Sequence, residues 1–185
     1  MPSQFQIRRA AATIRAGGVV AYPTEAVYGL GCNPEDSDAV VRLLSVKQRS
    51  LDHGLIVIGS DIEQLENYFG PVSKSLRQKL ARSWPGPQTW LVPAAARTPI
   101  WLTGKNKTVA VRVTAHPVAS ALCQACGHGL VSTSANRAGE TPARDSRTVR
   151  RTLGGELDYI LKGPIGNLAN PTPIRDLLTG KILRA

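Results

Sequence analysis

The chain contains little of what membrane, disulfide-rich and metal-dependent proteins require. No apolar run approaches the ~20 residues that cross a bilayer, so we expect no membrane partner. Three cysteines are too few, and odd in number, for a disulfide framework, which favours a reducing, cytoplasmic location. His53, His116 and His128 lie far apart without an HxxxH spacing, which argues against a metal-dependent hydrolase.

The standard nucleotide-binding and nucleophile motifs are also absent. No GxxxxGKS/T sequence occurs, and Gly29-Leu30-Gly31 lacks the third glycine of a dinucleotide-binding turn because Pro34 stands there. Ser132-Thr133-Ser134 has no GxSxG elbow around it. The lone CxxC from Cys123 to Cys126 lies in an apolar helical pattern, and we interpret it as buried helix cysteines; redox or metal chemistry is the alternative.

Acidic residues are scarce relative to basic ones. Thirteen Asp and Glu stand against 23 Lys and Arg, giving a net charge of +10. This excess favours a polyanionic partner, either nucleic acid or a phosphorylated small molecule, over a merely solubilising surface. Aromatic residues make up only 5% and do not alternate with the basic ones, so RNA is expected to be contacted through phosphates and shape.

Helical and strand patterns alternate along the whole chain. They predict a single α/β domain spanning 1–185, with a mixed sheet flanked by helices. Helices are expected at 4–16, 36–47, 61–69, 73–84, 117–125 and 145–153. Strands are expected at 19–23, 55–58, 89–94, 108–113, 130–134 and 158–162.

Two polar, turn-rich segments each follow a short β-branched run. The first is PTEAVYGLG (23–31) and the second is STSANRAG (132–139). Ligands bind where strands end in open α/β sheets. We therefore expect the two segments to form opposite walls of one anion-binding site, although each alone could be an ordinary polar turn.

Basic side chains at two positions point to the same anion. Lys47 and Arg49 follow the predicted helix, beyond its apolar face, and an extended backbone would turn both to one side. Two cations so placed suit a triphosphate or carboxylate, whereas two solvated surface cations are the alternative. Arg112 ends the apolar strand TVAVRV and is interpreted as a further ligand-binding cation.

Six sequence blocks together resemble the YrdC-like family of threonylcarbamoyl-adenylate synthases, in its short bacterial form. They occur in family order at compatible spacing. The blocks are YPTEAVYGLG (22–31), KQR (47–49), WPGPQT (84–89), VAVRVTAHP (109–117), LVSTSAN (130–136) and NPTPIRDLLTG (170–180). The resemblance implies a YrdC-like fold, a twisted mixed parallel and antiparallel sheet flanked by helices, with a concave, positively charged site.

The resemblance also implies an adenylyltransferase reaction. L-threonine, bicarbonate or CO2, and ATP with Mg²⁺ on its triphosphate would give threonylcarbamoyl-AMP and pyrophosphate. A downstream transferase complex would pass the threonylcarbamoyl group to the tRNA adenosine beside the anticodon, so tRNA or double-stranded RNA is an expected partner. The alternative is a non-catalytic factor that binds double-stranded RNA, tRNA or rRNA during maturation.

Residue roles follow from the same resemblance. The family's catalytic polar group is matched by Lys47, Arg49, Ser134 and Asn136. Its ATP-binding positions are matched by Arg49, Arg112, Ser134 and Arg184. Its threonine-binding positions are matched by Thr24, His116, Ser132 and Thr172. Glu25 is interpreted as a helper near the magnesium ion. Many longer relatives carry a histidine where this chain has Ile58, so we expect that threonine is held differently, with His53 as a substitute.

Overall fold

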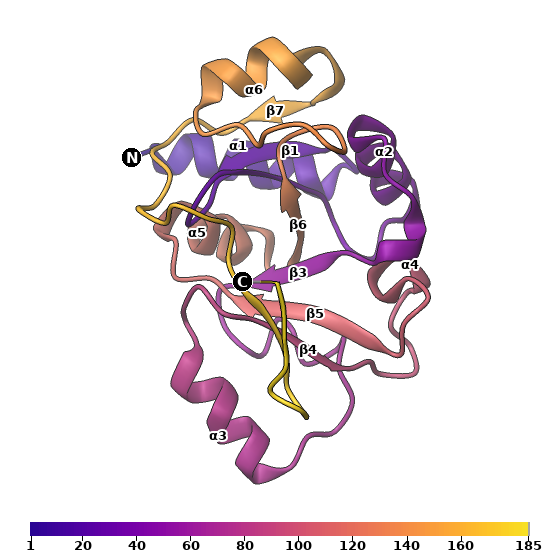
Figure 1. Ribbon diagram of the computed structural model, residues 1–185. Coiled ribbons are helices and arrows are strands. Elements are labelled where there is room, and N and C mark those ends of the chain that lie inside the picture. Colours follow the sequence, from indigo (N-terminus) through magenta and orange to yellow (C-terminus); the bar gives the residue numbers. More distant parts are fainter. Residues whose placement is uncertain (185) are drawn as a thin grey trace.

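The computed structural model describes residues 1–184 and holds nine strands in one mixed sheet (Figure 1). The strand order is β7-β1-β2-β6-β3-β5-β4-β8-β9. β1 pairs antiparallel with β2 and parallel with β7, so both kinds of pairing occur, as predicted. The strands are β1 (Val20–Pro23), β2 (Tyr28–Gly31), β3 (Ile56–Gly59), β4 (Thr89–Pro93), β5 (Thr108–Val113), β6 (Leu130–Ser134), β7 (Tyr159–Ile160), β8 (Ile174–Asp176) and β9 (Ile182–Arg184).

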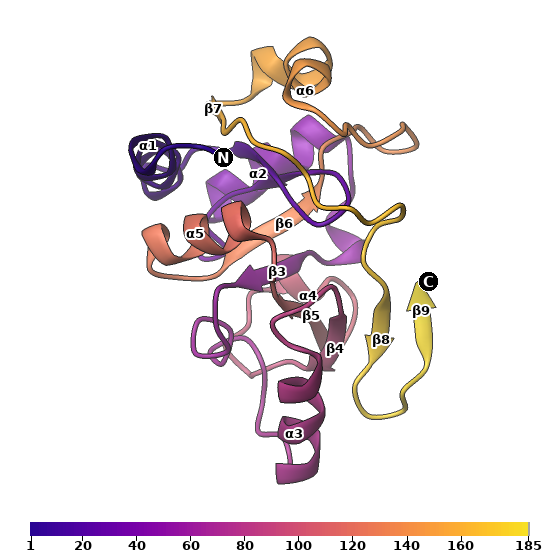
Figure 2. The same ribbon diagram turned by 90° about the vertical axis from the view of Figure 1, so that its left-hand side faces the viewer.

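Helices cover both faces of this sheet (Figure 2). They are α1 (Gln4–Arg15), α2 (Ser37–Lys47), α3 (Lys74–Ser83), α4 (Ile100–Thr103), α5 (Pro117–Cys126) and α6 (Ser146–Leu153). Local sequence fixes their starts: Ser3 forms a capping box at α1, and the Asp36 side chain accepts backbone N–H bonds at α2. None of the helices within residues 1–184 is long and apolar enough to cross a membrane.

Successive side chains of β5 point alternately to the two faces of the sheet, and each face has its own core. Val109, Val111 and Val113 point into the larger core, where the apolar side chains of α2 and α6 also pack. Ala110 and Arg112 point to the other face, because successive side chains of a strand alternate. On that face α1 and α5 bury a second, smaller core that includes Ile58 and Leu130.

The predicted helix 61–69 is absent, and four of the observed α-helices and strands were not predicted: α4, β2, β8 and β9. The segment 61–69 is a series of turns, not a helix, because its backbone bonds, such as Leu65 N to Ile62 O at 2.9 Å, do not propagate as a continuous ladder. The strand β2 was not predicted, since its two glycines are unusual in a strand. Gly31 is required there, because a Cβ would lie 2.4 Å from the carbonyl oxygen of Val131.

Candidate active site

A cavity of about 300 Å³ lies on the sheet face that α1 and α5 leave open. Its floor is formed by β3, β5 and β6, where Ile56 is the register partner of both Ala110 and Ser132. The C-terminal segment, with Thr172 and Arg184, closes one side. This size is at the lower end for small-molecule sites.

The two polar segments predicted from the sequence meet at this cavity, but as neighbouring strands. β2 pairs antiparallel with β6, which places Gly29 opposite Ser134. A Cβ on Gly29 would lie 3.1 Å from Thr24 Cγ2 and 3.5 Å from Ser132 Oγ, so these two hydroxyl residues flank the glycine. The prediction of opposite walls is therefore wrong: the hairpin β1–β2 brings the first segment alongside the second.

Lys47 joins the end of α2 to the loop after β6. Its Nζ donates hydrogen bonds to the carbonyl oxygens of Ser134 at 2.5 Å and Asn136 at 2.9 Å. Burial lowers the pKa of Lys47 to about 8, and the nearby charge of Arg49 adds to the shift. The side chain is 3% exposed, which contradicts the expectation that it lies beyond the apolar face of the helix.

The backbone between the two cations is also different from the prediction. Gln48 adopts a left-handed conformation, with φ 52° and ψ 48°, and the chain turns sharply there instead of extending. The side chain of Arg49 consequently points away from that of Lys47 and lines the cavity, where its Nη2 donates to the Gly54 carbonyl at 3.1 Å. Lys47 thus anchors the loop after β6, whereas Arg49 lines the cavity.

Three guanidinium groups line the cavity: Arg49, Arg112 and Arg184. Burial lowers the pKa of Arg49, and burial followed by the charges of Arg112 and Arg49 lowers the pKa of Arg184. The positive charges of this group are thus close enough to repel one another. An anion between them would relieve that repulsion.

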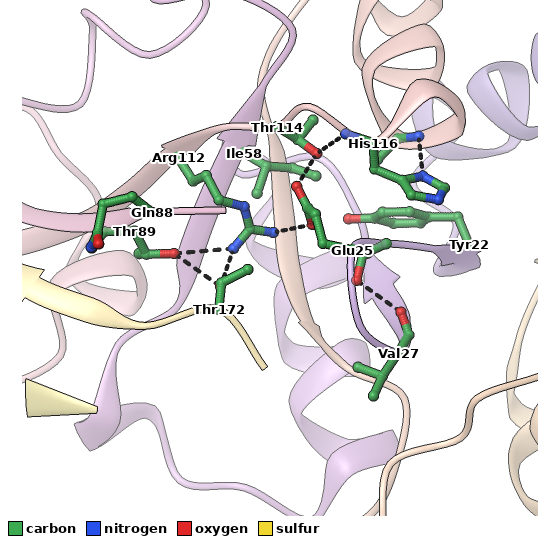
Figure 3. A network of polar contacts seen from close by, with 12 residues as sticks. Tyr22, Glu25, Val27, Ile58, Gln88, Thr89, Arg112, Thr114, His116 and Thr172 are labelled. Carbon is green, nitrogen blue, oxygen red and sulfur yellow. Dashed lines mark hydrogen bonds and ion pairs between the residues drawn. The ribbon is translucent and has the colours of Figure 1, made fainter. Parts of the chain in front are cut away.

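Arg112 is the most completely held of the three (Figure 3). Its Nη1 donates to Thr89 Oγ1 at 3.0 Å and to Thr172 Oγ1 at 2.7 Å. Its Nη2 pairs with Glu25 Oε2 at 3.3 Å, and the second carboxylate oxygen of Glu25 accepts from the Thr114 hydroxyl at 2.6 Å. Glu25 and Thr89 were not predicted as partners of Arg112, because only the fold brings these strands together.

His116 lies away from the cavity wall. Its Nδ1 caps the start of α5 by accepting from Ala119 N at 3.5 Å, so its Nε2 carries the proton and donates to Pro164 O at 3.2 Å. Burial lowers the pKa of the His116 ring, because it disfavours the charged imidazolium. Both nitrogens are occupied within the fold, so a direct threonine contact is not supported.

Ile58 does not line the cavity, because it is fully buried in the core beneath α5; it is the register partner of Arg112 and lies beside the polar network of that residue (Figure 3). The residue of β3 that faces the cavity is Ile56, two positions earlier. The expectation that Ile58 changes how threonine is held stays a prediction. His53 does line the cavity.

Comparison with known proteins agrees with these features. The family model Sua5/YciO/YrdC, whose description reads "Telomere recombination", matches residues 12–185. The chain belongs to this family. It is 53% identical over 180 residues to a threonylcarbamoyl-AMP synthase of Nitrosococcus oceani, covering 97% of each chain. It is 55% identical over 185 residues to one of Alkalilimnicola ehrlichii, covering 98% of this chain and 96% of the relative.

Two solved structures of the Sua5/YciO/YrdC family have the same fold. P. abyssi Sua5 complexed with L-threonine is 34% identical with a TM-score of 0.88, covering 94% of this chain and 51% of that one. E. coli YciO is 30% identical with a TM-score of 0.87, covering 100% of this chain and 90% of its own. The sheet and its flanking helices are thus the family architecture.

Most of the sequence-predicted site residues meet at the cavity of this family member. Those on its wall are Thr24, Arg49, Arg112, Ser132, Ser134, Thr172 and Arg184. Lys47 and Asn136 lie behind the wall and hold the loop after β6; the Asn136 amide donates to the carbonyl of Glu140 at 2.8 Å. Hydroxyls and guanidinium groups without a nucleophile–base pair suit ligand positioning and charge stabilisation.

Proposed function

We propose that this chain is an L-threonylcarbamoyl-AMP synthase, which makes threonylcarbamoyl-AMP and pyrophosphate from L-threonine, bicarbonate or CO2, and ATP. The observation that carries the proposal is a single cavity that combines three guanidinium groups with the hydroxyls of Thr24, Ser132 and Thr172. Guanidinium groups suit phosphates, and the small hydroxyls suit the amine, carboxylate and hydroxyl of threonine. The names of the close relatives support the same reaction.

The chemistry requires positioning more than a protein nucleophile. The neutral threonine amine adds to carbon dioxide and loses a proton, or condenses with bicarbonate and releases water, to give a carbamate. A carbamate oxygen then attacks the α-phosphorus of ATP as the bond to the pyrophosphate oxygen breaks, and pyrophosphate leaves. Arg49 and Arg184 would stabilise the charge on the phosphates, and Ser134 would donate to an α-phosphate oxygen. Lys47 and Asn136 would act by holding the backbone that carries Ser134.

Magnesium would enter with the triphosphate as part of the substrate. None of the residues lining the cavity within 1–184 is an aspartate or glutamate. Magnesium sites with ATP commonly use substrate phosphates, water and one or two carboxylates. The carboxylate of Glu25 is engaged with Arg112 and Thr114, so the expected role near the metal is not supported.

The direct test is to incubate the pure protein with ATP, L-threonine and bicarbonate and to measure pyrophosphate release. Release that depends on both threonine and bicarbonate supports the synthase. Omission of threonine is the internal control, because simple ATP hydrolysis would continue without it. Absence of threonine-dependent turnover would overturn the proposal.

The competing hypothesis is a non-catalytic RNA-binding factor, motivated by the net charge of +10. Tight, salt-sensitive binding of double-stranded RNA without turnover would favour it. We propose tRNA and a downstream threonylcarbamoyl-transferase complex as partners of the synthase, because its product is an activated acyl phosphate that must be handed on. The three free, buried cysteines suit a reducing, cytoplasmic location.

A further inference from the structure

A carboxylate and a guanidinium are buried together beside the cavity. Glu25 Oε2 lies 3.3 Å from Arg112 Nη2, and their side chains are only 8% and 5% exposed. It is the only ion pair within residues 1–184 in which both side chains are buried. Desolvation of two charges is costly, and pairing often does no more than offset it, so such a pair is poorly explained by stability alone.

Glu25 is held so that its carboxylate faces Arg112 and not the cavity. Its Oε1 accepts from the Thr114 hydroxyl at 2.6 Å, which uses the second carboxylate oxygen. Its backbone carbonyl accepts from Leu168 N at 3.1 Å. Glu25 does not line the cavity, so it would act on a ligand only through another residue.

Arg112 transmits this restraint to the cavity wall. Its Nη1 donates to Thr172 Oγ1 at 2.7 Å, and the carbonyl oxygen of Thr172 accepts from Arg184 Nη2 at 2.7 Å. The Nε of Arg112 is buried and has no partner within residues 1–184. A guanidinium has five N–H donors, so Arg112 keeps donor capacity for an anion while its plane is fixed.

From these contacts we propose that Glu25 is a positioning residue: it fixes the Arg112 guanidinium and, through Thr172, the C-terminal strand that carries Arg184. This role rests on the proposed synthase function. Glu25 touches no substrate; it holds two cavity-lining guanidinium groups in the geometry that the anionic substrates require. The carboxylate charge is essential, because a neutral amide of the same shape would attract Arg112 more weakly.

The test compares Glu25→Gln with the wild-type protein. The matched control is Glu66→Gln, whose carboxylate pairs with Arg77 at 2.7 Å on the surface, with side chains 41% and 53% exposed. Melting temperature, calorimetric binding of ATP and threonine separately, and kcat and KM for pyrophosphate release are measured for each. We expect Glu25→Gln to fold, to lower kcat/KM about tenfold or more, and to weaken binding of ATP or threonine. Glu66→Gln should match wild type.

Unchanged kcat/KM and unchanged affinities in Glu25→Gln would overturn the proposal. So would an activity loss that disappears when assays are run well below the melting temperature, because that would mark a purely structural role. If Glu25→Gln does not fold, Thr114→Val removes the hydroxyl that holds Oε1 and should lower kcat/KM several-fold, whereas wild-type kinetics would overturn the proposal. Failure of the wild-type protein to release pyrophosphate would refute the synthase function instead, and ATP calorimetry would still decide the role of Glu25.

Discussion

Lys47 Nζ donates a hydrogen bond to the carbonyl oxygen of Ser134 at 2.5 Å, across 87 positions of the chain. This bond ties the end of α2 to the end of β6, where the loop that carries Asn136 begins. The lysine expected to contact substrate therefore supports the backbone of a second expected site residue. Its removal should affect folding and activity together.

Lys47→Met and Arg49→Ala should separate these two roles. Lys47→Met removes a donor from the carbonyl oxygens of Ser134 and Asn136, of which the first keeps a bond from Asn136 N at 3.1 Å, and should lower the free energy of unfolding by about 1–3 kcal/mol. Arg49→Ala should abolish most pyrophosphate release with stability close to wild type, because Arg49 lines the cavity. Chemical denaturation and the threonine-dependent assay measure the two effects. Near-normal turnover by Arg49→Ala would contradict its phosphate-binding role.

Stability should depend on pH through Lys47. Burial lowers its pKa to about 8 in the folded protein, whereas an unfolded lysine titrates near about 10.4. Between these values the unfolded chain binds more protons, so the free energy of unfolding should rise with pH. Urea denaturation of wild type and Lys47→Met from about pH 7 to about pH 10.5 tests this, because the variant lacks the titrating group. The free energy of unfolding of the wild type, relative to that of Lys47→Met, should increase above about pH 8. A decrease in this difference would contradict the lowered pKa of Lys47.

His116→Asn should leave the threonine KM near that of wild type. Asparagine is a good N-cap, so the start of α5 should be preserved, whereas His116→Ala should cost about 0.5–2 kcal/mol of stability. Kinetics at saturating ATP and thermal melts measure the two properties. A threonine KM raised about tenfold in a stable His116→Asn protein would restore the ligand role predicted from the sequence.

Gly166→Ala should disturb the site from the C-terminal side. A Cβ at this position would lie 2.5 Å from the carbonyl oxygen of Glu25, so the segment leading to Thr172 must move. We expect a loss of about 1–3 kcal/mol of stability and weaker threonine binding by calorimetry. Gly155→Ala is the matched control, since nothing lies within 4 Å of its added Cβ. Equal behaviour of the two variants would argue against tight packing at Gly166.

Cys123→Ser and Cys126→Ser should retain nearly full activity. Both thiols are buried in the core shared by α1 and α5, and burial raises the pKa of Cys126 to about 11. No group of three metal-ligating side chains occurs within residues 1–184. The measured change should be a lower melting temperature, because a hydroxyl replaces a buried thiol. A metal-dependent loss of pyrophosphate release would contradict the assignment of these cysteines to the core.

Local sequence determined most of the secondary structure and the composition of the site. The apolar spacing and the Asp36 cap specify α2, and alternation in TVAVRV specifies β5 with Arg112 on the opposite face from its valines. These features act over a few residues, through backbone geometry and side-chain periodicity. The order of the six sequence blocks likewise indicates the family without any tertiary contact.

Only the tertiary structure decided which side chain performs which task. Lys47 is buried at the end of α2, and the left-handed backbone at Gln48 turns the chain so that Arg49 lines the cavity instead. Glu25 and Arg112 are 87 positions apart, and no local sequence pattern predicts their pairing. Contacts of this kind depend on strand order and register, which join distant segments and place each polar group where a partner is within hydrogen-bonding distance.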